Sequence, residues 1–223
     1  MFCFRDAKIN KMKVLYLGMA HDIMSPLLLV PNVKTIYSID SFDPCFSSDK
    51  TWEGQKQDIK QVLTQGNDFD TRTYHCYTRY PEKSKEIHYL SHTSTIITDI
   101  DDGKKWTLIF KYGRYRIIEL IYYHNRDFYD PHGWPTDIQN INHIMGMGAP
   151  VFYYGIYNNR QAIDELTQAE CDVLVQQFKE RTSKSGYIMY ALNFLHEHWP
   201  EKITIKNGHQ RNGEIISIYP VFA

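Results

Sequence analysis

The stretch that decides the fold is KVLYLGMAHDIMSPLLLVPNVKTIYSID, residues 13 to 40. An apolar run typical of a buried strand, Val14–Leu17, ends at Gly18, and a second such run, Thr35–Ile39, ends at Asp40. A glycine directly after a strand permits a tight turn and a close approach of backbone to a ligand. A carboxylate that closes the next strand can accept hydrogen bonds from ribose hydroxyls. The spacing therefore predicts a βαβ unit that can hold a nucleotide-like ligand.

Length and composition are those of one folded domain. The chain has 223 residues, of which 43% are apolar and 23% charged, and its formal net charge is −1. These values are ordinary for a globular protein, so we expect a single domain over residues 1–223. A net charge this small gives no overall field that would recruit nucleic acid or an anionic membrane, and binding to either would need a local patch.

The cysteines and the hydropathy pattern predict a compartment. No C-x-x-C pair occurs, and the four widely spaced cysteines suit reduced thiols better than a disulfide framework: Cys3, Cys45, Cys76 and Cys171. The first residues carry Arg5, Asp6 and Lys8 and lack the apolar core of a signal peptide. No apolar run approaches eighteen residues, so we expect no membrane span and a cytoplasmic location.

Residues 71–123 are rich in β-formers and predict a β-rich insertion or antiparallel meander. TRTYHCYTRY (71–80) alternates, and three strand-like runs follow it: STIITDI, KWTLIFKY and RYRIIELIYY. Asp102-Gly103 and Gly113-Arg114 separate these three runs and suit tight hairpins. The last run can also serve as a central strand of the main sheet.

The rest of the chain has an α/β rhythm. Thr167 and Glu170 form an S/T-x-x-E capping box, which predicts the start of a helix. The pattern KITIKNGHQRNGEIISIYPVF predicts a terminal β-hairpin. We further expect helices over 52–65, 136–145 and 187–198, and a strand over 151–157.

This organisation resembles the class I S-adenosylmethionine-dependent methyltransferases, a Rossmann-type α/β family. Their sheet is mostly parallel and closes with a reversed last strand, and their first loop reads like G-x-G-x-G or G-x-A-P-G. Gly18 and Ala20 match that loop, whereas His21 and Asp22 depart from it and would crowd the pocket. The resemblance covers residues 13–40 by motif and roughly 149–222 by element order. It implies a mostly parallel sheet with an antiparallel β-meander insertion and a C-terminal β-hairpin.

The same resemblance implies S-adenosylmethionine as cofactor. The first loop would wrap its methionine part, Asp40 would bind the ribose hydroxyls, and Ser41 or Phe42 would border the adenine. The implied cofactor-binding residues are Gly18, Met19, Ala20, Asp40, Ser41 and Phe42. The residues alone also allow a purely structural interpretation, in which Gly18 makes a tight turn and Asp40 caps a loop.

Catalytic residues are not assigned. Tyr16–Ala20, with Asp40 and Asp43-Pro44, is similar to the corresponding stretch of poxvirus-type cap 2′-O-methyltransferases, a viral family. Their lysine-aspartate-lysine-glutamate catalytic set has no counterpart that we can place on this sequence.

Two further sites lie near a predicted strand end. Asp130–Pro135, DPHGWP, is similar to the D-P-P-W motif of amino-methylating methyltransferases, although a surface turn is the stronger interpretation. His124 and Asn125 lie closer to the strand end, where α/β sheets place ligands, and are better candidates for lining a pocket.

Other chemistry is less well marked. The pairs His88/His92 and His196/His198 lack an H-E-x-x-H motif or a cysteine cluster, so we assign no metal. Basic and aromatic residues alternate on the meander and would suit single-stranded nucleic acid, or simply form a solvated outer face. They are Lys104, Lys105, Trp106, Lys111, Tyr112, Arg114, Tyr115 and Arg116.

Three functions remain open at this point. The first is a methyltransferase that acts on nucleic acid or protein. The second is a non-catalytic descendant of that fold, retained as an interaction or structural subunit with a protein partner. The third, an NAD-dependent Rossmann enzyme, is the weakest because G-x-G-x-x-G is absent: Ala20 and Ile23 occupy its third and sixth positions.

Overall fold

The computed structural model describes residues 11–20, 22–23, 26–27, 30, 32–40, 51–64, 94–124, 126, 130–146, 167–190, 203–205 and 216–220. Within these residues the chain is an α/β protein built on one mixed sheet of nine strands. The described strands of the β-rich middle segment belong to this same sheet, so that segment is continuous with the sheet rather than a separate unit.

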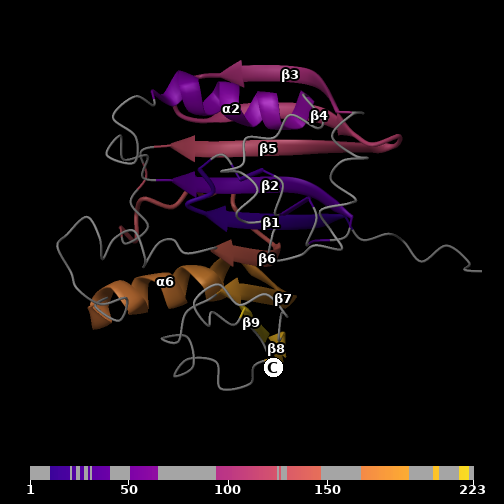
Figure 1. Cartoon of the computed structure of the whole chain (residues 1–223). Coiled ribbons are helices and arrows are strands. Elements are labelled where there is room, and N and C mark those ends of the chain that lie inside the picture. The colour runs from indigo at the N-terminus through magenta and orange to yellow at the C-terminus, as the bar shows by residue number, and fades with distance from the viewer. Residues whose placement is uncertain are drawn as a thin grey trace, which may run out of the picture.

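Figure 1 shows the sheet and its two described helices. The strands are β1 (Met12–Leu17), β2 (Val33–Asp40), β3 (Thr95–Asp101), β4 (Trp106–Tyr112), β5 (Arg116–His124), β6 (Ile141–Gly146), β7 (Thr182–Tyr190), β8 (Ile203–Ile205) and β9 (Ile216–Pro220). The helices are α2 (Trp52–Thr64) and α6 (Gln168–Arg181). The spatial order of the strands is β3-β4-β5-β2-β1-β6-β7-β9-β8.

The direction of the strands corrects one expectation. The five central strands, β5 to β7 in spatial order, pair in parallel. The β3-β4-β5 meander on one side and the β7-β9-β8 group on the other pair antiparallel. Four of the eight pairings are therefore parallel and four antiparallel. The sheet is mixed, and the prediction of a mostly parallel sheet holds for its centre alone.

Strand β1 is buried on both faces, which explains its unbroken apolar sequence. Val14 and Tyr16 pack into one hydrophobic core, and Leu15 and Leu17 pack into another on the opposite face. The first core includes Ile59 and Leu63 of α2, and the second includes Leu174, Val175 and Phe178 of α6. The sheet is thus the middle layer between two helical or loop layers.

The connections between the parallel strands cover both faces of the sheet. The β1–β2 and β2–β5 connections place Ile23, Val30 and α2 on the first core, and the β6–β7 connection places α6 on the second. The chain therefore builds outward from β1 toward β5 and, later, from β6 toward β7. The reversal of strand order falls between β1 and β6.

The predicted turns and caps are confirmed. Gly103 and Gly113 have φ values of 78° and 66° in the two meander turns, a region that favours glycine. Strands β8 and β9 pair as the expected C-terminal hairpin. At α6, Thr167 accepts from the Glu170 backbone and the Glu170 side chain accepts from the Thr167 N–H, which completes the capping box.

Two predicted helices are wrong. Residues 141–146 form strand β6, because Asn140 turns the chain at a φ of 57° and Ile141 and Ile144 then pack into the second core. Ile141, Ile144 and Met145 have the i, i+3, i+4 spacing of a helix, so the pattern of this short run predicts the wrong element. Residues 187–190, the start of the predicted helix over 187–198, belong to strand β7, and residues 191–198 lie outside the described residues. The predicted strands over 71–80 and 151–157 lie outside the described residues.

Candidate functional site

The turn after β1 has an unusual backbone. Gly18 has a φ of 61° and its N–H donates to the Ile39 carbonyl at 2.9 Å, which joins the ends of β1 and β2. Ala20 also has a positive φ, 49°, a conformation that costs an alanine on the order of 1 kcal/mol. The Ala20 N–H donates to Asp40 Oδ2 at 3.0 Å. The carboxylate of Asp40 therefore helps to hold the turn in this conformation.

Asp40 lies in a hydrogen-bond network with two other side chains. The Tyr122 hydroxyl, from β5, donates to Asp40 Oδ2 at 2.6 Å. Gln55 Nε2, from the first turn of α2, donates to the Tyr122 hydroxyl at 2.5 Å and to the Ala20 carbonyl at 3.2 Å. Four segments thus meet at one point: the β1 turn, the end of β2, the end of β5 and the start of α2.

The electrostatics of the network keep the Tyr122 proton in place. Burial and then the neighbouring Asp40 carboxylate raise the pKa of the Tyr122 hydroxyl well above its ordinary value. Tyr122 is therefore a neutral donor at any physiological pH, and Asp40 is its acceptor. Hydrogen bonds to an ionised acceptor are about twice as strong as neutral ones.

An aromatic cluster borders this network. The Trp52 ring stacks on His124 with centroids 4.3 Å apart and an interplanar angle of 24°, and it meets Tyr122 at 5.1 Å and Trp106 at 5.8 Å. His124 is the register partner of Asp40 at the adjacent ends of β5 and β2. Burial lowers the pKa of His124, which favours the neutral form of the ring that stacks on Trp52.

An ion-pair network fixes α2 over the meander. Lys56 Nζ lies 2.8 Å from Asp101 Oδ2 and 2.5 Å from Glu53 Oε1. Trp52 Nε1 donates to the same Asp101 oxygen at 2.8 Å. Burial opposes the charge of Asp101, but the hydrogen bonds from Lys56, Trp52 and the Gly103 N–H outweigh it and lower the pKa of Asp101 to about 2. This network positions Trp52 and Gln55 at the carboxyl ends of the strands.

The structure brings together three of the six predicted cofactor residues: Gly18, Ala20 and Asp40. Met19 follows Gly18 in the chain, but the residue is only 1% exposed and belongs to the first core, so its side chain does not line the edge. Ser41 and Phe42 lie outside the described residues.

The departure from the family loop also has a structural role. Asp22 is buried, and its carboxylate accepts a hydrogen bond from the Tyr16 hydroxyl at 2.7 Å. The Asp22 side chain therefore points inward and forms a hydrogen bond with Tyr16, a core residue of β1. It does not crowd the edge of the sheet. His21 lies outside the described residues.

The sequence did not reveal Tyr122 and Gln55. Tyr122 is one of two adjacent tyrosines, and only the strand register decides which of them meets Asp40. Gln55 lies fifteen positions after Asp40 and reaches the network because α2 packs against the meander. His124, which was expected to line a pocket, does lie at this edge, whereas Asn125 falls outside the described residues.

The D-P-P-W-like stretch is a packed turn. The Gly133 N–H donates to the Asp130 carbonyl at 3.0 Å, and Trp134 is 3% exposed in the second core. Arg181 of α6 lies over the Trp134 ring and donates to the Pro135 carbonyl at 2.9 Å. Because Trp134 is buried, it offers no face on which a base could stack.

The comparisons with known proteins give no family. Neither a protein family model nor a curated protein sequence matches this chain. In the part of the chain that the structure describes, no three His, Cys, Asp or Glu side chains gather closely enough to hold a metal ion. The helices of that part are all too short or too polar to span a bilayer.

Proposed function

We propose that the carboxyl edge of β1 and β2 binds S-adenosylmethionine and that the chain is a methyltransferase-like protein acting on nucleic acid or protein. The observation that carries this proposal is the parallel β1–β2 pair, in which Leu17 lies in register with Ile39. This register puts the Gly18 turn and the Asp40 carboxylate at adjacent strand ends, where a nucleoside would need them.

The topology supports the same edge. In doubly wound α/β sheets, ligands bind outside the carboxyl ends of the strands where the strand order reverses. Here the order reverses between β1 and β6, and Gly18 is the residue that follows β1. Strand β9 runs antiparallel to β7, in keeping with the reversed last strand of the class I methyltransferase sheet.

The residues at the edge suit a nucleoside. The Asp40 carboxylate is a hydrogen-bond acceptor at this edge, where the Ala20 N–H and the Tyr122 hydroxyl donate to its Oδ2. A ribose diol would donate to the same carboxylate. The stacked Trp52 and His124 rings next to it are aromatic groups of the kind that pack against a purine. When bound, S-adenosylmethionine supplies an activated methyl group.

A specific observation favours a second candidate function, a non-catalytic member of the same fold that serves as a binding subunit. The Ala20 N–H and the Asp40 carboxylate are groups that a cofactor would use, and here they bind each other at 3.0 Å. This contact gives Asp40 a structural role that requires no cofactor.

Thermal unfolding with S-adenosylhomocysteine separates the two candidates. A ligand at one hundred times its dissociation constant stabilises the folded state by about 2.7 kcal/mol, which is several degrees in Tm for a domain of this size. The methyltransferase proposal predicts this shift, and its loss in Asp40→Ala. Asp99→Asn, a matched acid on β3, is the control and should keep it. No shift at millimolar ligand supports the non-catalytic candidate instead.

A further inference from the structure

Charged groups are distributed unequally between the two ends of the strands. At the carboxyl edge three described lysines are paired: Lys56 with Asp101 at 2.8 Å, Lys60 with Asp99 at 2.9 Å, and Lys105 with Asp137 at 3.7 Å; Lys104 of the β3–β4 turn is in no ion pair between described residues. At the opposite, amino edge, no ion pair between described residues involves the cations of the β4–β5 turn. Those cations are Arg114 in the turn itself, Lys111 near the end of β4 and Arg116 at the start of β5.

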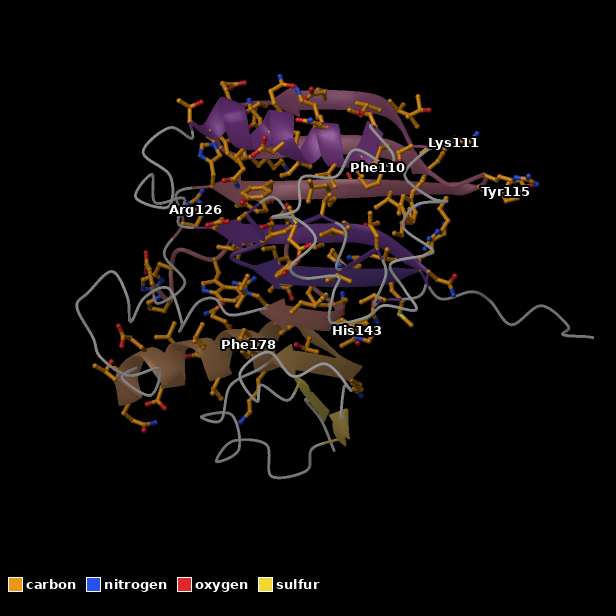
Figure 2. The ribbon with its side chains drawn as sticks, viewed as in Figure 1. Phe110, Lys111, Tyr115, Arg126, His143 and Phe178 are labelled. Atoms are coloured by element: carbon orange, nitrogen blue, oxygen red, sulfur yellow. The ribbon has the colours of Figure 1, made fainter. Side chains whose placement is uncertain are left out.

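The β4–β5 turn presents an aromatic ring among these cations. Tyr115 is 88% exposed, and Arg114 and Arg116 flank it in the chain. Figure 2 shows Tyr115 at the tip of the hairpin and Lys111 near the same end, with Arg126 at the other end of the strands. Arg116 lies over the buried Tyr112 ring at 4.8 Å, which anchors its guanidinium beside the tip.

The positive charge continues along the neighbouring strands. Lys34 is at the start of β2 and Lys11 immediately precedes β1, and both are exposed. Strands β5, β2 and β1 are adjacent and parallel, so Arg116, Lys34 and Lys11 form an uneven row near the same edge, in which Lys34 lies level with Ile118 and thus two residues further along the strands than Arg116. At about 4.8 Å between strands, the row spans on the order of 10 Å.

We infer that this amino edge, defined by Lys11, Lys34, Lys111, Arg114, Tyr115 and Arg116, binds single-stranded nucleic acid. The cations pair with phosphates along the strand, and Tyr115 stacks on a base. An exposed ring between two guanidinium groups favours nucleic acid over an acidic protein, because every base has a π-face to stack and an acidic side chain has none. The site is at the opposite end of the strands from Asp40, so it does not depend on the proposed cofactor site.

This surface is smaller than the basic and aromatic alternation of the sequence suggests. Trp106 and Tyr112 are fully buried and have no face for a base. Lys104 and Lys105 belong to the β3–β4 turn, at the opposite end of β4 from Arg114. Lys104 and Lys105 therefore lie outside the proposed binding surface, and their substitution provides a control that changes the charge by the same amount.

Fluorescence anisotropy of a labelled twelve-nucleotide single-stranded RNA with the full chain tests the inference. Lys111→Gln/Arg114→Gln should weaken binding at least fivefold, whereas Lys104→Gln/Lys105→Gln, with the same change in charge, should stay within twofold. The slope of log K against log salt should fall by about 0.7 for each phosphate contact removed, and so by about 1.4 in the first variant.

Tyr115→Ala separates base stacking from charge. It should weaken RNA binding at least fivefold and leave the salt slope unchanged, and Tyr115→Trp should restore the affinity. All of the substituted side chains are exposed or lie in turns, so unfolding curves should match those of the wild type. Absence of binding at 50 mM salt, or equal losses in both turn variants, overturns the inference. Equal competition by polyglutamate with no effect of Tyr115→Ala also overturns it and indicates an acidic protein partner.

Discussion

The Tyr122 hydroxyl donates to the Asp40 carboxylate at 2.6 Å, across the neighbouring ends of two parallel strands. This bond makes Asp40 a structural residue as well as a candidate ligand-binding one. It ties the end of β5 to the turn after β1, since the same carboxylate oxygen also accepts from the Ala20 N–H. The candidate site is therefore held by residues of the paired strands β2 and β5 as well as by the turn after β1.

Replacement of Tyr122 by phenylalanine should destabilise the protein. Tyr122→Phe removes the donor to Asp40 and leaves Gln55 without one of its acceptors, at a cost of about 1–3 kcal/mol for buried groups. Urea unfolding measures the change. Tyr115→Phe, at an 88% exposed position, is the matched control and should stay within about 0.5 kcal/mol of the wild type. Equal stability of the two variants would show that the network contributes nothing.

Asp101 should contribute to acid sensitivity. Its pKa is about 2 in the folded protein and about 3.9 in an unfolded chain, so its stabilising effect is complete above pH 4 and is lost as the pH falls from 4 to 2. Because Asp101 is partly exposed, solvent screening limits the effect to about 1 kcal/mol or less. Asp101→Asn should flatten the stability profile in that window, and Asp172→Asn on α6 should not. A profile in which both variants follow the wild type would contradict the Lys56–Asp101 assignment.

Gly186 should not tolerate a side chain. A Cβ there would lie 1.9 Å from Thr182 Cγ2 and 3.0 Å from the Ile141 carbonyl oxygen, where β7 passes β6. The Thr182 side chain cannot easily turn away because its hydroxyl donates to the Phe178 carbonyl at 2.5 Å. Gly186→Ala should therefore destabilise by about 1–3 kcal/mol in urea unfolding.

Gly54→Ala is the control for Gly186. Gly54 lies in α2, and a Cβ there would meet Thr51 Oγ1 at an ordinary 3.6 Å. The substitution should stabilise the helix by about 0.5–1 kcal/mol, because alanine loses less conformational freedom than glycine. Loss of stability at Gly54 comparable to that at Gly186 would mean that the steric argument is wrong.

Much of the fold could be predicted from local signals. Glycine turns, the Thr167 capping box and alternating β-formers act over a few residues, and the structure has the elements they predict. Strand β6 was missed because Ile141, Ile144 and Met145 have the i, i+3, i+4 spacing of a helix, and β7 was missed because its apolar part, Tyr187–Tyr190, lacks a period of two. Hairpin turns make the antiparallel direction of β3, β4 and β8 predictable, whereas the place of β6 and β7 in the sheet depends on long-range pairing, which no local pattern encodes.

The candidate site could be predicted only where its residues are close together in the sequence. Gly18, Ala20 and Asp40 share one βαβ unit, so their spacing in the sequence carries the geometry. Tyr122 and Gln55 come from segments whose position depends on the β2–β5 register and on the packing of α2. The burial of Met19 and Trp134 likewise depends on which face of the sheet each segment covers.

The central claim is that Asp40 receives a ribose in addition to holding the turn. Isothermal titration with S-adenosylhomocysteine on the wild type, Asp40→Asn and Asp99→Asn tests it most directly. Asparagine keeps an oxygen that can accept from Ala20 and Tyr122 but removes the charge, so the fold should survive while binding weakens. If Asp40 binds a ribose, the wild type and Asp99→Asn should bind measurably, and Asp40→Asn should bind at least tenfold more weakly. Binding that is absent from the wild type, or unchanged in Asp40→Asn, would contradict it.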